Sequence, residues 1–145
     1  MKVKGTKTLN VETDIKITGI TLLSIEEHEK YEDKIPLNAG WWWLRSPGDY
    51  PDDAASVNYD GSVYYDGHRV SRGRGGVRPI LKGVFADING FEFADHSWIV
   101  LAEDMAICKD NIGLRRFDAE SNDYEKSEIK QWLENWLKEA LESEE

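Results

Sequence analysis

The sequence of 145 residues predicts a single α+β domain built mostly from short antiparallel strands, with two helices. Three observations lead to this fold class. Apolar and polar residues alternate in several short segments, as expected of half-buried strands. Asp-Gly and Asn-Gly pairs recur between such segments, where hairpin turns need residues that tolerate positive φ. Two further segments carry apolar residues at helical spacing, and the chain is long enough to bury a core beneath them.

The first elements are strands followed by a short helix. The alternation in DIKITGITLL predicts strands within residues 2–23. Ser24 and Glu27 have the spacing of a capping box, which opens a helix that ends at Pro36. Its core-facing residues are expected to be Ile25, His28, Tyr31 and Ile35. On that face, His28 is interpreted as a packed helix residue rather than a ligand of a metal or cofactor.

The segment AGWWWLRSPG, residues 39–48, predicts a very apolar strand that ends at Ser-Pro-Gly. Because side chains alternate between the two faces of a strand, Trp41 and Trp43 should share one face, with Trp42 and Leu44 on the other. Core on both sides is favoured over a tryptophan in a surface groove, since aromatic side chains bury large areas.

The next segment contains two Asp-Gly pairs, at 60–61 and 66–67, each flanked by strand-like residues. Both pairs suit type I′ hairpin turns. The core side of the successive strands is expected to carry Val57, Val63 and Val70. SRGRGG then predicts a loop, and VRPILKG predicts a strand that Pro79 either interrupts or confines to an edge.

Residues 84–110 predict three strands, with a hairpin turn at Asn89-Gly90. A loop over residues 111–123 precedes a helix from about Asp123 to Leu141. The apolar stripe of this helix consists of Ile129, Trp132, Leu133, Trp136, Leu137, Ala140 and Leu141. Its other face is polar without being basic, which favours packing on the sheet over a membrane surface, and Glu134 is spaced to pair with Lys138.

Charge and cysteine content exclude several classes of function. The net charge is −10, and all of it arises in residues 84–145, which disfavours general binding to a phosphate backbone. The single cysteine, Cys108, excludes an intrachain disulfide and a cysteine-based metal site, and its apolar setting predicts a buried core residue. No apolar run is long enough to span a membrane, and MKVKGTKTLN lacks the features of a signal peptide. Cytoplasmic synthesis is therefore expected, followed by action in a host cytoplasm or association with a virion.

No constellation of residues predicts catalysis. A nucleophile elbow, an EF-hand loop, a P-loop and a dinucleotide-binding glycine motif are all absent from the sequence. The aspartates of residues 49–66 fit turn chemistry better than a calcium site. We therefore expect no catalytic residue, no metal and no cofactor.

The composition of residues 49–74 matches a recognition surface. Tyrosine offers broad, rigid contact area, Ser, Gly, Asn and Asp offer adaptable hydrogen bonding, and arginine with tyrosine is enriched where interfaces bind most strongly. Polar turns alone explain the Asp-Gly pairs but not the tyrosines and arginines between them. The predicted ligand-binding residues are Tyr50, Asn58, Tyr64, Asp66, His68, Arg69, Ser71, Arg72 and Arg74. Tyr59 and Tyr65 are predicted to be semi-buried supports.

Four segments, LLSIEEHEKYEDKIP, WWWLRSPG, AASVNYDGSVYYDG and GGVRPIL, resemble a domain family of bacterial and phage proteins that carry WWLRSPG, V-x-x-D-G and GVRPAL motifs. That family is similar to the C-type-lectin-like variable proteins of diversity-generating retroelements. The resemblance implies a compact C-type-lectin-like fold that displays variable side chains on one face as a ligand-binding site. The sugar-and-calcium motif of calcium-dependent lectins is absent, and so are the cysteines of the formylglycine-generating enzymes, so neither chemistry is carried over.

The resemblance also divides the single domain, 1–145, into an N-terminal arm at 1–21, the motif segment at 22–83 and a remainder at 84–145. In the family, the segment that begins FEFADHSW is expected before WWLRSPG, whereas here it follows GVRPIL. This order resembles a circular permutation, or a second half-copy.

Two hypotheses of function follow. The first is a non-enzymatic recognition module of phage or prophage origin, with a protein favoured over a glycan as its partner and no direct binding of nucleic acid. The second is a small acidic phage inhibitor of a host defence system. It would block a nucleic-acid site with residues 84–145, or sequester an anionic signal on Arg69, Arg72 and Arg74.

Overall fold

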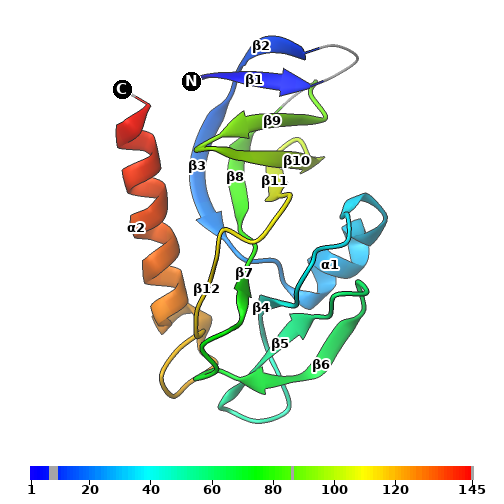
Figure 1. Cartoon of the computed structure of the whole chain (residues 1–145), viewed down its shortest axis with the longest axis vertical. Helices are drawn as coiled ribbons and strands as arrows, with labels where there is room; N and C mark the ends of the chain where they lie inside the picture. The colour runs from blue at the N-terminus through cyan, green and yellow to red at the C-terminus, as the bar shows by residue number, and fades with distance from the viewer. Residues whose placement is uncertain (7–9, 86, 145) are drawn as a thin grey trace.

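The computed structural model describes residues 1–6, 10–85 and 87–144 of the chain. Two curled sheets lie end to end, and the C-terminal helix runs along the side of the larger one (Figure 1). The strands are mostly antiparallel and two α-helices accompany them, so the predicted compact α+β class is confirmed.

In the described part of the chain, the larger sheet has seven strands in the order β2-β1-β9-β10-β11-β8-β3. Their bounds are β1 (Lys2–Thr6), β2 (Asn10–Asp14), β3 (Lys16–Thr21), β8 (Ile80–Val84), β9 (Gly90–Phe93), β10 (His96–Ala102) and β11 (Met105–Cys108). The N-terminal strands predicted within residues 2–23 therefore lie at both edges of this sheet, because β2 and β3 are its outermost strands.

The smaller sheet has five strands in the order β12-β7-β4-β5-β6. Their bounds are β4 (Trp42–Pro47), β5 (Asp53–Val57), β6 (Val63–Arg69), β7 (Gly76–Val77) and β12 (Gly113–Leu114). The segment VRPILKG is interrupted at Pro79, as predicted, and the interruption separates two strands that belong to different sheets. β7 belongs to the smaller sheet and β8 to the larger, so Arg78-Pro79 is the crossing point between them. Proline suits this point because it has no N–H to leave unpaired.

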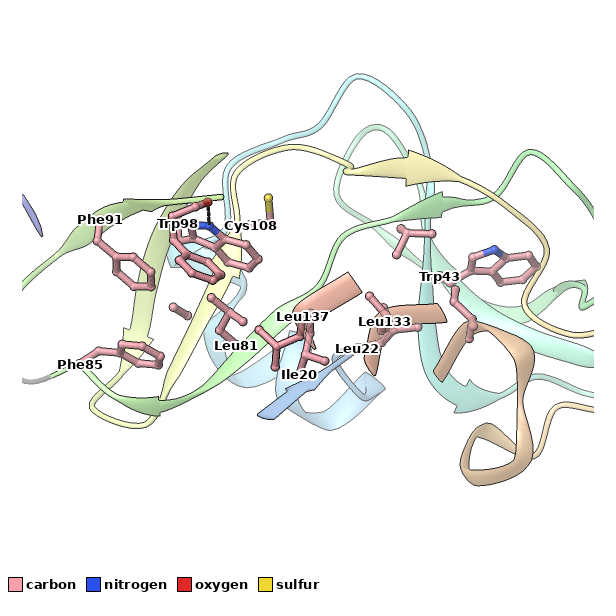
Figure 2. Close-up of a cluster of buried hydrophobic side chains, with 14 of the residues drawn as sticks. Ile20, Leu22, Trp43, Leu81, Phe85, Phe91, Trp98, Cys108, Leu133 and Leu137 are labelled. Carbon is pink, nitrogen blue, oxygen red and sulfur yellow. Dashed lines mark hydrogen bonds between the residues drawn. The ribbon is translucent and has the colours of Figure 1, made fainter. Parts of the chain in front are cut away.

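The C-terminal helix α2 (Glu128–Ser143) follows a 3₁₀ turn, η2 (Tyr124–Lys126), and is capped by the Ser127 hydroxyl, which accepts a hydrogen bond from the Lys130 N–H. The helix thus begins about five residues later than predicted. Its whole predicted stripe packs on the core, and the helix contacts β3. Figure 2 shows Leu133 and Leu137 of this stripe near Ile20 and Leu22. The expected pairing of Glu134 with Lys138 is replaced by one with Lys130, at 3.5 Å.

The tryptophan strand β4 alternates as predicted. Trp43 belongs to the core beneath α2, where it contacts Trp41, whereas Trp42 and Leu44 belong to a second core on the opposite face. That second core is covered by α1 (Ile25–Tyr31) and the 3₁₀ turn η1 (Glu32–Lys34). The first three residues of β4, Trp42, Trp43 and Leu44, are buried, so core on both sides is confirmed.

Three predicted turns differ in the structure. Asp60-Gly61 lies in a five-residue connection, because Val57 pairs with Val63, and only Gly61 has positive φ. Asp66-Gly67 is no turn but a bulge within β6, with Gly67 at φ +85°.

The third difference concerns Asn89-Gly90. Gly90 already belongs to β9 and pairs with Thr6 and Ile99. The tight turn comes four residues later, at Ala94 and Asp95, which both have positive φ and join β9 to β10 as a type I′ turn would. Alanine rarely adopts positive φ, so the sequence gives no indication of a turn at Ala94.

The capping box of α1 is present in full. The Glu27 N–H donates to the Ser24 hydroxyl at 3.1 Å, and the Ser24 N–H donates to the Glu27 carboxylate at 3.0 Å. Glu27 also forms an ion pair with Arg45, whose guanidinium donates to the Leu22 carbonyl at 2.7 Å. Burial acts to raise the pKa of Glu27, but the hydrogen bonds from Arg45 and Ser24 outweigh it and lower that pKa below its ordinary 4.5.

Glu27→Gln is expected to lower the free energy of unfolding by about 1 kcal/mol at neutral pH, the usual magnitude of a helix cap. A carboxyl whose pKa is lower in the folded state stabilises fully above its unfolded pKa and loses the effect as pH falls through the folded value. The difference between wild type and variant should therefore shrink below pH 4.5. Urea denaturation from pH 3 to 7 measures it, and a difference that stays constant over this range would contradict the assignment.

Candidate functional site

The nine predicted ligand-binding residues, here called the hairpin face, lie on β6, its flanking loops and the approach to β5. They are Tyr50, Asn58, Tyr64, Asp66, His68, Arg69, Ser71, Arg72 and Arg74. Asn58 and His68 are half-buried and the other seven are exposed. Val57 and Val70 anchor the hairpin in the core as predicted, whereas Val63 is only partly buried.

The predicted support role of Tyr59 and Tyr65 is wrong. Their exposed fractions are 71% and 54%, larger than the 39% of Tyr64. Tyr59 lies in the connection 58–62, outside the alternation of the strand. The bulge at Gly67 disturbs the alternation further along, and the Tyr65 hydroxyl reaches Glu29 on α1 at 2.7 Å. Both tyrosines therefore extend the exposed aromatic surface instead of supporting it.

Three members of the hairpin face form a cluster with a tryptophan. The His68 ring packs on Trp41 with 4.0 Å between ring centroids, and the edge of Tyr64 approaches His68 at 5.1 Å. Arg72 Nη1 lies 3.4 Å from His68 Nδ1. The structure thus brings together side chains that are spread from position 41 to position 72.

The cluster rests on Trp43, which is fully buried. Trp43 meets Trp41 edge to face at 4.9 Å, contacts Phe117 at 5.7 Å, and donates from its indole N–H to the Arg115 carbonyl at 2.9 Å. A hydrogen-bonded indole with packed neighbours is held in one orientation, so the half-exposed rings above it are held as well.

The uncharged form of His68 favours this ring packing. Burial lowers the pKa of His68, and the positive charge of Arg72 lowers it further. At neutral pH the imidazole is therefore uncharged, and it presents both a ring face and an acceptor nitrogen.

Carboxylates form the second feature of the hairpin face. The Asp49 N–H donates to the Asp66 carbonyl at 3.0 Å, which draws the bulge toward the loop before β5. A hydrogen bond with the Asp66 carboxyl, together with repulsion from its charge, raises the pKa of Asp49. Arg69 approaches Asp52 at 3.9 Å across the same region. Within the described residues, no group of three or more His, Cys, Asp or Glu side chains is arranged to hold a metal ion.

Gly67 makes the bulge possible. A Cβ at this position would lie 2.4 Å from the Ala54 carbonyl oxygen, and φ is +85°. Only glycine accommodates both conditions without strain.

Cys108 is a buried core residue, as predicted. Burial raises the pKa of its thiol to about 11, so the thiol is protonated at neutral pH. The thiolate is the nucleophilic form, and Cys108 therefore lacks the character of a reactive cysteine.

Trp41 is the residue of the site that the composition of 49–74 did not indicate. It lies outside that segment and comes beside His68 only because β4 and β6 both flank β5. Three consecutive tryptophans leave open that one of them lies in a surface groove, and this was the only signal in the sequence for the role of Trp41.

Residues 9–82 match a protein family described as domain of unknown function (DUF6273). Among curated proteins and solved structures, none matches the chain. No helix in the described ranges has both the length and the apolar character required to cross a membrane.

Proposed function

The chain belongs to the DUF6273 family, a domain family of unknown function, and we propose that this member is a non-enzymatic binding module whose hairpin face recognises a protein partner. A single observation carries the proposal: Tyr64, His68 and Arg72 gather on Trp41, at the surface, above the rigid Trp43 support. Exposed aromatic rings beside arginine are the side chains that contribute most strongly to protein interfaces.

A protein is favoured over a glycan because the hairpin face mixes both signs of charge. Arg69 lies 3.9 Å from Asp52 and pairs with Asp53 across the two strands, and Asp66, Arg72 and Arg74 are exposed on the same hairpin. Such a mixture of charges complements a polar protein surface. The exposed Tyr59 and Tyr65 add apolar area next to it. The pKa of His68 lies below its ordinary value, so the cluster keeps its uncharged ring at neutral pH.

The proposal extends to the fold and its origin. We propose that the domain is C-type-lectin-like, of phage or prophage origin, and related to the variable proteins of diversity-generating retroelements. The position of both termini at the same end of the molecule supports a permuted segment order, since a permutation joins ends that lie close together (Figure 1).

Combined replacement of Tyr64, Arg69 and Arg72 by alanine is expected to lower affinity for the partner at least 100-fold, since each is a truncation of an exposed anchor. Because all three side chains are exposed, the melting temperature should change by no more than about 2 °C. Binding is measured by capture of host proteins on immobilised wild type and variant, followed by calorimetry with the recovered partner.

The matched control replaces Lys138, Glu139 and Glu142, which are exposed on α2, by alanine. This control should retain the partner. A fall in melting temperature of more than about 6 °C in the hairpin variant would place its three residues in the structural frame instead. If the wild type captures nucleases or defence effectors, and both triple variants still capture them, the acidic-inhibitor hypothesis would be favoured.

A further inference from the structure

A concave site separate from the hairpin face lies on the Trp42 side of β4, opposite Trp43. It is formed between α1 with its following turn η1 and the β5–β6 connection. Its volume is about 210 Å³. One water molecule needs only about 10–15 Å³, so the site has room for a small ligand. His28, Trp42 and Arg78 line it together with Asn38. Asp33, Leu37 and Asp60, which are exposed, also line it, so the site opens to the surface.

Two buried polar atoms that line this pocket have no hydrogen-bond partner among the described residues. They are His28 Nδ1 and Asn38 Nδ2. His28 is only 2% exposed, and its ring is fixed by an edge contact with Trp42 at 5.8 Å between centroids. A buried polar group without a partner costs about 1–3 kcal/mol, so a site that keeps two of them is suited to a ligand that satisfies both.

The inner end of the pocket carries a positive charge. Arg78 is fully buried, and within the described residues its three hydrogen bonds all go to backbone carbonyls, at 2.7–3.0 Å. Two of its five N–H groups remain without a partner in the described chain. No carboxylate of the described residues forms an ion pair with it. With Asn38 Nδ2, a donor, and neutral His28, which can donate from Nδ1, this end is complementary to a carboxylate.

The outer end has the opposite charge. Asp33 and Asp60 line the mouth and are exposed, and the exposed Glu32 also lines the pocket, close enough to His28 to act on its pKa. An anion alone would be repelled there, whereas a ligand with a cationic end would be attracted. The wall between the two ends includes the Trp42 ring, Ile35 and Val57, which suit a short aliphatic stem.

From this burial and charge gradient we infer that the pocket binds a small zwitterion with a basic side chain, a lysine-like amino acid. Its α-carboxylate lies at Arg78, Asn38 and His28, and its side-chain ammonium lies among the acidic residues at the mouth. At a peptide C-terminus the α-nitrogen is an uncharged amide, so no second ammonium approaches Arg78 there. The site is separate from the hairpin face, apart from Asn58 at the shared end of the hairpin.

Titration calorimetry of the full chain with L-lysine is expected to show saturable binding with Kd at or below about 1 mM. Hexanoate, which lacks the ammonium groups, and 1,5-diaminopentane, which lacks the carboxylate, should each bind at least tenfold more weakly. Glycyl-lysine distinguishes the source of the ligand: equal affinity indicates a peptide C-terminus, and weaker affinity a free amino acid.

His28→Phe removes Nδ1 and keeps a ring against Trp42, so we expect at least a tenfold loss of lysine affinity without loss of stability. Asp33→Asn should weaken binding severalfold, and the matched control Glu139→Gln, on α2, should not. The triple hairpin variant should bind lysine as wild type does, which separates this site from the proposed protein-binding function. Absence of saturable lysine binding, equal binding of hexanoate, or unchanged affinity in a folded His28→Phe protein would overturn the inference and leave the pocket filled by water alone.

Discussion

Arg78→Leu is expected to lower the free energy of unfolding by about 3–5 kcal/mol, the magnitude seen when a buried charged network is broken. The Arg78 guanidinium donates to the carbonyls of Cys108 at 2.8 Å, Pro36 at 3.0 Å and Lys109 at 2.7 Å. The Pro36 carbonyl lies in the loop before β4, the other two lie at the end of β11, and Arg78 itself lies where the chain crosses between the sheets. One side chain thus joins three segments that lie far apart in the sequence.

Two opposing contributions decide how much unfolding free energy the Arg78→Leu variant loses. Burial lowers the pKa of Arg78 to about 10, which corresponds to a desolvation cost of about 3 kcal/mol that the leucine variant would recover. Against this, three hydrogen bonds from a charged donor contribute about 1.5–3 kcal/mol each, and their loss leaves three carbonyls unpaired. The hydrogen bonds dominate, so the net effect is destabilising.

Arg78→Lys is the informative companion variant. It keeps the positive charge but has a single nitrogen, which cannot reproduce the planar arrangement that serves three carbonyls. We expect it to lose at least half as much stability as Arg78→Leu. Urea denaturation at pH 7 measures both variants, and a loss below about 1 kcal/mol in either would contradict the network described here.

The role of Arg78 also shows where sequence reasoning stopped. The sequence predicts that Pro79 either interrupts VRPILKG or confines it to an edge, and the structure shows the interruption. An arginine in such a segment, however, is ordinarily expected to face solvent. Its burial depends on carbonyls near positions 36 and 108, and nothing in the local sequence indicates that these converge. The same holds for the pocket formed with His28 and Asn38.

Elements set by local periodicity were predictable. The apolar stripe of α2 and the alternation of Trp41, Trp42 and Trp43 follow from 3.6- and 2-residue periods, and both are present in the structure. Turn positions were less predictable, because Asp-Gly suits a hairpin and a bulge equally. The register of Val57 with Val63 places the connection at 58–62, and the next Asp-Gly pair then falls inside β6.

The exposure of the hairpin face is predicted by the composition of residues 49–74, whereas the errors at Tyr59 and Tyr65 come from assuming strand alternation and have two origins. Tyr59 lies in the connection rather than in a strand, and the bulge at Gly67 breaks the period along β6. An alternating pattern cannot reveal a bulge in advance, since the extra residues belong to neither face.

Trp43→Ala is expected to have the second large effect, a loss of about 3–5 kcal/mol, as for other buried tryptophans replaced by alanine. Trp43 is fully buried (Figure 2), and it packs against Phe117 from the loop that precedes α2. A Cβ on Gly75 would lie 1.9 Å from its indole nitrogen, so no space exists there for a substitute side chain. Trp43→Phe should cost less, but it leaves the Arg115 carbonyl without its donor.

The same variant connects stability with the proposed function, because Trp41 and His68 both contact Trp43. Trp43→Ala should therefore weaken partner binding even below the temperature at which the domain unfolds. Trp41→Ala is the matched comparison: Trp41 is half-exposed, so we expect a loss of only about 1–2 kcal/mol together with an equal or larger loss of affinity. Denaturation and calorimetry on both variants separate the two contributions. Should Trp43→Ala fold stably and bind as wild type does, the aromatic cluster would not depend on its buried support, and the recognition face would have to be sought elsewhere on the molecule.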